Sequence, residues 1–192
     1  MVCRMRRFFI HFISVIQSSA NTLEYYVYGK TKLKSNICSF QGLIKIVESK
    51  IYLVRENSYH KQGVIKGEYC FYEDPNKKGS GILKGVFKTN FYIDTNSKIK
   101  YNSLGFISDD FNNNQFEGNW TSYKSKESKK CNWGDYRIPD SKELDSGAAE
   151  FIPIDKYVKN GWGTYLEQIS TDKVKADEAR RIEEVKWWNI NE

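Results

Sequence analysis

A recurring glycine is the feature that most restricts how this chain can fold. In seven alternating stretches a glycine lies two residues from an apolar or aromatic side chain: Val27-x-Gly29-x-Thr31, Phe40-x-Gly42-x-Ile44, Ile65-x-Gly67-x-Tyr69, Leu83-x-Gly85-x-Phe87, Ser103-x-Gly105-x-Ile107, Phe116-x-Gly118-x-Trp120 and Asn132-x-Gly134-x-Tyr136. Side chains of a strand alternate between its two faces, so each glycine shares a face with these neighbours. Glycines on the inward face of adjacent strands remove bulk where a sheet bends or where a ring must lie on the backbone. The pattern therefore predicts a closed or strongly curved sheet.

Strand and turn signals place this sheet within residues 21–139. Alternating stretches rich in aromatic and β-branched residues predict strands at 24–33, 37–47, 50–56, 63–73, 80–93, 98–107, 115–123 and 130–138. The segments between them are short and carry turn residues, as in Asp74-Pro75-Asn76. Short connections favour antiparallel neighbours, and closure of a sheet removes its exposed edges. We predict a mainly β fold, an antiparallel meander of eight strands in a closed or strongly curved barrel.

Residues 140–192 differ in composition and predict an appendage to the barrel. Thr171 and Asp172 are typical of a helix N-terminus. One side of the expected helix carries an apolar stripe of Val174, Ala179, Ile182, Val185 and Trp188. A free helix ending in two tryptophans would expose an apolar patch to water. We therefore expect a C-terminal loop and helix that pack on the barrel.

Residues 1–20 have the pattern of a secretory signal peptide. Arg4, Arg6 and Arg7 precede a mostly apolar run at residues 8–16, and small residues follow at Ser18-Ser19-Ala20. We predict cleavage after Ala20 and a secreted or periplasmic protein without a transmembrane helix in the mature chain. The alternative is a short amphipathic or buried N-terminal segment.

The cysteines are compatible with secretion. Outside residues 1–20 the chain has Cys38, Cys70 and Cys131, which permit one disulfide and one remaining thiol. Cys38 shares the glycine face of its strand with Phe40, whereas Cys70 and Cys131 are expected on the opposite face of theirs. Opposite faces of a sheet are difficult to bridge, so the favoured disulfide is Cys70 with Cys131.

Charge and histidine content argue against two classes of function. The net charge is +6, but residues 21–140 contain only Arg55 and Arg137 as arginines, and nucleic-acid binding usually requires a denser basic stripe. His60 is the only histidine after residue 20, and the sequence has no Cys-x-x-Cys, phosphate-binding loop or nucleophile motif. The sequence favours a non-catalytic protein that binds no nucleic acid, cofactor or metal.

One motif resembles a known repeat. Phe116-Glu117-Gly118-Asn119-Trp120, together with residues 65–69 and 83–87, resembles the aromatic-x-Gly-x-aromatic core of a MORN repeat. The resemblance implies a scaffold of stacked hairpins that binds proteins or lipids.

A small secreted meander barrel also resembles the calycin and lipocalin-like group in its architecture. That resemblance implies a carrier of a small hydrophobic ligand. Eight strands enclose a space that packed side chains can fill or that one small ligand can occupy. The residues that would line or fill it are Tyr69, Phe87, Phe116, Trp120 and Tyr136. Because these rings lie opposite glycines, we favour a filled interior.

We therefore predict a non-catalytic barrel that binds a macromolecular partner, either another protein or an envelope component, as an inhibitor, an immunity-like factor or an envelope-associated module. Trp133, Asp135 and Arg137 are expected on the outer face of the last strand, with Tyr123 beside them. Tryptophan and arginine are favoured anchors at interfaces. The alternative is that these residues only cover the C-terminal helix.

Overall fold

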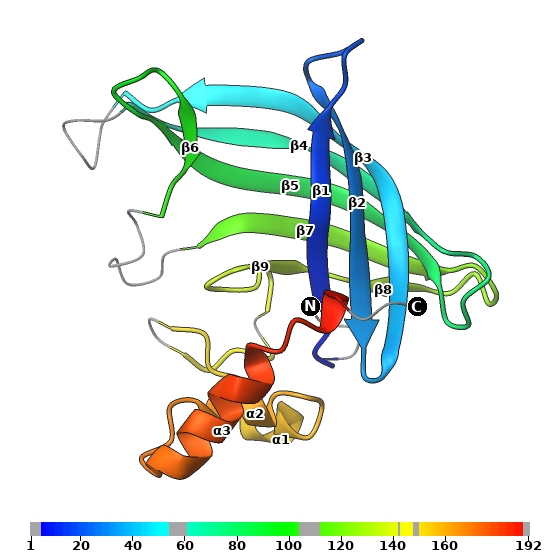
Figure 1. Ribbon diagram of the computed structural model, residues 1–192, viewed down its shortest axis with the longest axis vertical. Coiled ribbons are helices and arrows are strands. Elements are labelled where there is room, and N and C mark those ends of the chain that lie inside the picture. The colour runs from blue at the N-terminus through cyan, green and yellow to red at the C-terminus, as the bar shows by residue number, and fades with distance from the viewer. Residues whose placement is uncertain (1–4, 54–60, 104–111, 142, 148–149, 190–192) are drawn as a thin grey trace.

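The structure is a computed structural model of the 192-residue chain. It describes residues 5–53, 61–103, 112–141, 143–147 and 150–189 (Figure 1). The predicted Gly105 segment beyond Ser103, residues 54–56 of the predicted strand 50–56, and His60 lie outside these ranges.

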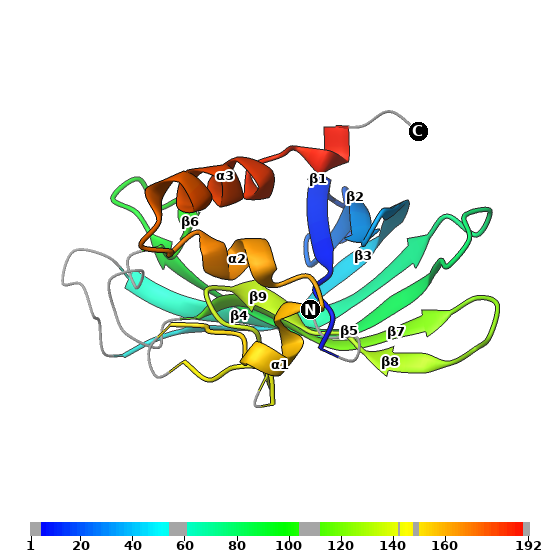
Figure 2. The same cartoon turned by 90° about the horizontal axis from the view of Figure 1, so that it is seen from below.

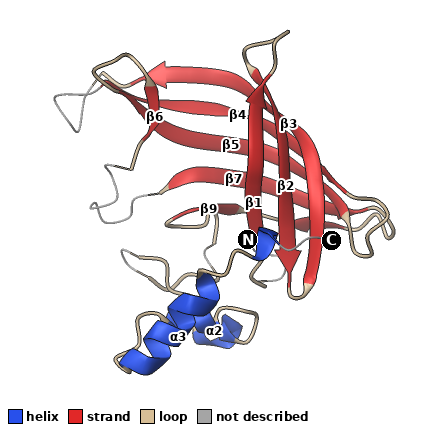
Figure 3. Ribbon diagram, in the orientation of Figure 1, coloured by secondary structure: helices blue, strands red, loops and turns tan. Residues whose placement is uncertain are grey.

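The chain is mainly β, with one antiparallel sheet of nine strands that curls into a half-barrel (Figures 1 and 3). The strands are β1 (Phe9–Gln17), β2 (Glu24–Leu33), β3 (Asn36–Ile51), β4 (Lys61–Glu73), β5 (Gly81–Ile93), β6 (Ile99–Tyr101), β7 (Asn113–Ser122), β8 (Ser128–Lys130) and β9 (Trp133–Asp135). The strand order is β1-β2-β3-β4-β5-β7-β8, while β6 pairs with β5 and β9 with β7. The predicted antiparallel, strongly curved sheet is confirmed, and its two ends, β1 and β8, do not pair within the described ranges.

The curvature depends on glycines that face aromatic rings on neighbouring strands. The register pairs Gly29 with Phe40, Gly42 with Phe71, Gly63 with Phe91, Gly67 with Phe87, and Gly85 with Tyr69. A Cβ atom on Gly29 would lie 2.5 Å from the ring of Phe40, and one on Gly67 would lie 2.5 Å from the ring of Phe87. At Gly29, Gly63 and Gly67 the rings therefore occupy the space that a side chain would need, whereas at Gly42 and Gly85 the backbone of the neighbouring strand does so.

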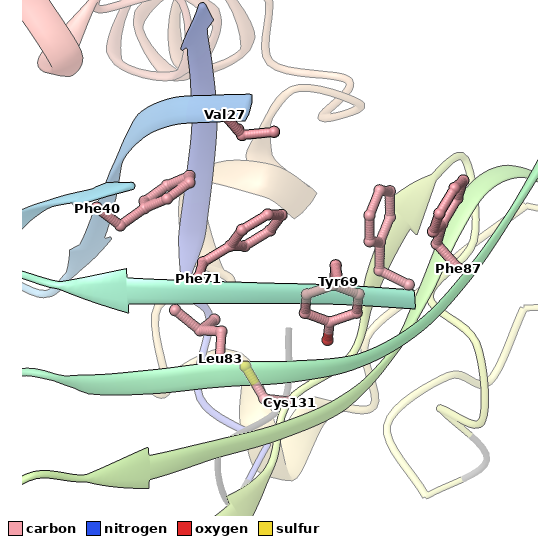
Figure 4. Packing of buried hydrophobic residues seen from close by; sticks show 8 residues of the cluster. Val27, Phe40, Tyr69, Phe71, Leu83, Phe87 and Cys131 are labelled. Carbon is pink, nitrogen blue, oxygen red and sulfur yellow. The ribbon is translucent and has the colours of Figure 1, made fainter. Parts of the chain in front are cut away.

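The sheet folds far enough for strands distant in its order to share one core. Phe12 of β1 has its ring centroid 5.6 Å from that of Phe71 on β4 and 6.0 Å from that of Phe116 on β7. Figure 4 shows the core cluster, whose buried members are Val27, Phe40, Tyr69, Phe71, Leu83, Phe87, Phe116 and Cys131. Burial of this many rings is a major source of the stability of the sheet.

Residues from the predicted signal peptide belong to this fold. β1 pairs with β2 along its whole length, and its Phe12 packs against the core. Arg7 donates two hydrogen bonds of 2.6 and 2.7 Å to the Glu183 carboxylate in the C-terminal region. Cleavage after Ala20 stays a prediction, and it would remove both β1 and this ion pair.

The C-terminal appendage contains α1 (Asp155–Val158), α2 (Gly163–Glu167), α3 (Lys173–Glu183) and a 3-10 turn (Trp187–Asn189). In Figure 1 α2 and α3 lie below the sheet, beyond β9, and Figure 2 shows the 3-10 turn that follows α3 at one end of β1. Leu144, Phe151 and Trp162 form a second small core there. Asp172 caps α3 as predicted, by accepting hydrogen bonds from the backbone of Val174 and Lys175.

The helix does not bury the predicted apolar stripe. Its buried residues are Ala176 and Ala179, whereas Val174, Ile182 and Val185 are exposed. The link to the sheet comes instead from the two tryptophans that follow the helix. Trp187 is buried near Phe9, and Trp188 stacks on His11 of β1 with ring centroids 3.8 Å apart.

Candidate functional site

The predicted anchor Trp133 packs against the core, partly buried, and not on the outer face. Its ring stacks on Phe116 at a centroid distance of 4.8 Å and an interplanar angle of 10°, and it meets Tyr69 at 5.1 Å. The prediction of an exposed Trp133 is wrong because it assumed that Gly134 lies on the inner face. The pairing of β7 instead places Trp133 opposite the inward-facing Phe116, so Trp133 shares the inner face.

The other predicted partner-binding residues do not form one surface. The Asp135 carboxylate accepts hydrogen bonds from the Tyr101 hydroxyl at 2.6 Å and from Asn114 at 2.7 Å. Arg137 forms an ion pair of 2.6 Å with Asp145. Asp135 pairs with the first residue of β7, whereas Tyr123 follows the last residue of that strand. The length of β7 therefore separates Tyr123 from the rest.

The residues considered as ligand-lining are mostly core residues. Tyr69, Phe87 and Phe116 are buried in the main cluster, and Tyr136 is exposed. Only Trp120 among the five borders a described cavity. Within the described part of the chain, aromatic rings of this cluster pack against the inner face of the sheet.

The predicted disulfide does not form in the structure, where Cys38, Cys70 and Cys131 are all thiols. Cys70 lies between the inward-facing Tyr69 and Phe71 and therefore faces outward. Cys131 belongs to the core cluster and is completely buried. The structure lacks the predicted pairing because the two cysteines lie on opposite faces: Lys129 pairs with the inward-facing Trp120, so Cys131, two residues further on, also faces inward.

Two hollows are lined by residues of the β4–β5 and β7–β8 regions. Figure 1 shows the β4–β5 and β7–β8 turns at the right. The backbone N–H of Tyr123 donates to the carbonyl of Ser80 at 3.1 Å and joins the two turns. On the inner side lies a cavity of about 230 Å³, which we call the Glu73 cavity. Its lining consists of Phe8, Thr31, Leu33, Asn36, Glu73, Gly79, Trp120 and Lys129.

Glu73 is a carboxyl group in an unusual environment. It is the last residue of β4, follows the inward positions Tyr69 and Phe71, and is only 3% exposed. Its carboxylate accepts hydrogen bonds from the Thr31 hydroxyl at 2.5 Å, the Gly81 backbone N–H at 2.8 Å and the Trp120 indole N–H at 2.9 Å.

Burial raises the pKa of Glu73 above its ordinary value, although these three hydrogen bonds favour the ionised form. All three donors are neutral groups. Within the described part of the chain, the acid is therefore held in place by the sheet without a positively charged partner in direct contact.

The outer side of the same end carries a second hollow, which we call the outer groove, of about 460 Å³. Tyr28, Gln41 and Tyr72 lie side by side across β2, β3 and β4. Tyr28 and Tyr72 are 44% and 50% exposed. The complete lining is Tyr28, Ser39, Phe40, Gln41, Tyr72, Glu73, Asp74, Pro75 and Tyr123.

The outer groove offers aromatic surface and neutral hydrogen-bonding groups. Among the described residues that line it, none is lysine, arginine or histidine. Asp74 uses one carboxylate oxygen to accept hydrogen bonds from Asn76 and so shapes the turn. Glu73 and Asp74 thus each accept hydrogen bonds from neighbouring parts of the chain.

Comparisons with known proteins yield no match: no family model, no curated protein and no solved structure is similar to this chain. No three His, Cys, Asp or Glu side chains come together as a candidate metal site in the described parts of the chain. No helix in the described ranges has the length and apolar character needed to cross a membrane.

Glu73 and the outer tyrosines were not predicted from the sequence. Positions 69, 71 and 73 alternate along one strand and therefore share a face. Because Tyr69 and Phe71 are expected to face inward, this pattern could have indicated that Glu73 is a buried acid. Tyr28 and Tyr72 lie on the face opposite the glycines. Their alignment could not be recognised without the register between β2, β3 and β4.

Proposed function

We propose that this chain is a non-catalytic binding protein whose outer groove binds a neutral polysaccharide. The observation that carries the proposal is the row of Tyr28, Gln41 and Tyr72, in which two exposed rings flank an amide on adjacent strands. A sugar ring presents C–H groups on its face and hydroxyls at its edge. Tyrosine rings can contact the face, and amide and hydroxyl groups can bind the edge.

The charge of the groove supports a neutral ligand. Phosphate, sulfate and carboxylate groups are usually bound by arginine or lysine, and the described lining of the groove has neither. Two acids, Glu73 and Asp74, would oppose an anionic chain. A neutral glycan carries no charged group that would need a lysine or arginine partner in the groove.

A secreted or periplasmic location forms a separate part of the proposal. It is supported by the pattern of residues 1–20 and would give the groove access to envelope or extracellular glycans. Mass spectrometry of protein from the producing cell tests it, because an intact form confined to the cytoplasm would refute this location. That result would leave glycan binding to be decided by its own experiment.

Affinity electrophoresis against neutral glucans, mannans, xylan and chitin tests the proposed ligand. We expect the wild-type protein to be retarded by at least one of them. Tyr72→Ala and Tyr28→Ala should each weaken binding by about tenfold or more, as expected for a central aromatic contact. Tyr72→Phe should retain most of the binding because it keeps the ring.

Tyr26→Ala is the matched control. Tyr26 lies two residues from Tyr28 on the same face of β2 and is 56% exposed, but it does not line the groove. It should therefore leave glycan binding unchanged. Failure of folded wild-type protein to bind any of these polysaccharides would refute the proposal. A protein partner that requires Tyr26 as much as Tyr72 would instead assign this face to protein recognition.

A further inference from the structure

The Glu73 cavity contains a buried acid whose described partners leave its charge unpaired. Buried carboxylates in proteins are usually paired with a cation, because loss of hydration strongly disfavours an isolated charge. Among the described residues, Glu73 receives hydrogen bonds only from the neutral groups of Thr31, Gly81 and Trp120. Burial raises its pKa, as expected for a carboxyl group without such a cation.

The carboxylate retains capacity for one more donor. An ionised carboxylate can accept about four hydrogen bonds, two at each oxygen. Oε2 of Glu73 receives those from Gly81 and Trp120, whereas Oε1 receives the one from Thr31. The remaining position on Oε1 suits an N–H donor, and a charged donor would supply the missing positive charge.

The walls of the cavity suit a compact apolar group. Leu33 and Trp120 contribute apolar surface next to Glu73, and Phe8 adds to it in the chain that retains residues 1–20. A cavity of about 150 Å³ in another protein is large enough for benzene, so about 230 Å³ accommodates an aromatic ring with a short substituent. An ammonium group near Trp120 would also gain from the negative face of the indole ring.

We propose that the Glu73 cavity binds a small primary ammonium compound with a compact apolar body, whose ammonium group donates a hydrogen bond to Glu73 and whose body contacts Phe8, Leu33 and Trp120. This site lies on the inner side of the sheet and shares only Glu73 with the lining of the outer groove, where the glycan is proposed to bind. Lys129, at the edge of the cavity, has its Nζ 5.8 Å from the centroid of the Trp120 ring and 3.9 Å from a Glu127 oxygen. The positive charge of Lys129 would repel a ligand that carries more than one positive charge.

Three probes of similar shape test the proposal with the full chain. Isothermal titration calorimetry compares 2-phenylethylamine, 2-phenylethanol and 3-phenylpropionate, which share a ring and differ in charge. We expect the amine to bind at least about tenfold more tightly than the alcohol, since hydrogen bonds to charged groups contribute more than neutral ones. The propionate should bind least. Equal affinity of amine and alcohol, preference for the propionate, or no binding of the amine would each overturn the proposal.

Variants of the cavity locate the binding. Glu73→Gln keeps the shape of the side chain and should abolish the preference for the amine over the alcohol. Leu33→Trp fills the cavity without altering Glu73 and should abolish binding of both probes. Glu68→Gln, at an exposed position on the same strand, is the matched control and should behave as wild type.

Circular dichroism establishes that each variant is folded. If Glu73→Gln does not fold, the comparison of probes on wild-type protein and the Leu33→Trp variant still decide the proposal. Undiminished binding of the amine to folded Leu33→Trp would place the site elsewhere and overturn it. Retention of glycan binding by the same variant would show that the two sites are distinct.

Discussion

Substitution of Gly67 by alanine should destabilise the protein, although alanine usually favours folding over glycine. The added Cβ would collide with the backbone carbonyl of Lys45 on β3 and would lie 2.5 Å from the Phe87 ring on β5. Neither neighbour can move freely, because one belongs to the hydrogen-bonded ladder and the other to the core. Overpacking typically costs about 1–3 kcal/mol, while the lower chain entropy of the unfolded alanine variant returns about 0.4–1 kcal/mol.

The net loss for Gly67→Ala is therefore about 1–2 kcal/mol. In a domain of this size that loss lowers Tm by roughly 2–8 °C. Gly163→Ala is the matched control, since no atom lies within 4 Å of the position that its Cβ would take at the start of α2. Urea unfolding of both variants measures the difference, and Gly163→Ala should equal or exceed wild type. A Gly67→Ala protein as stable as wild type would refute the explanation of the glycine pattern by close packing.

The core, the buried acid and the first strand each give a further testable expectation. Trp133→Ala should lower the free energy of unfolding by about 3 kcal/mol, because its ring packs on Phe116; unchanged urea unfolding would contradict its place in the core. Burial raises the pKa of Glu73, so its stability contribution is complete below about pH 4.5 and declines as pH rises through the raised value. Glu73→Gln should lack this decline in a pH series of unfolding curves, and parallel curves for both proteins would contradict the assignment. A chain that begins at Asn21 should unfold at a lower urea concentration than the full chain because it lacks β1; equal stability would make cleavage after Ala20 compatible with the fold.

The amino-acid sequence was sufficient to predict the class of fold. Alternation with period two identifies strands from local residues alone, and the bounds of β2 agree with the prediction. The glycines also predicted the curvature, because a missing side chain on an inward position has a direct steric consequence. What the pattern left open was the partner of each glycine. The opposition of Gly67 and Phe87, for example, depends on the register of two strands.

The tertiary structure places residues 9–17 in an edge strand and decides the face on which Trp133 lies. A short apolar run preceded by arginines has the same local sequence pattern in a signal peptide and in an edge strand. Its place in β1 is visible only from its pairing with β2 and from the packing of Phe12 against the core. Parity predicts which residues of a strand share a face, but not which face is the inner one. The register with β7, which places Trp133 opposite the inward-facing Phe116, decided that Cys131 and Trp133 face inward.

Neither proposed site could be located from local pattern, because each joins residues from strands that are distant in the chain. Glu73 meets Thr31 and Trp120, which are 42 and 47 residues away, only after the sheet has curled. Tyr28 and Tyr72 align only through the register with β3. Sequence periodicity describes one strand at a time, whereas the cavity and the groove depend on curvature and register among several. The physical environment that raises the pKa of Glu73 is therefore a property of the folded sheet.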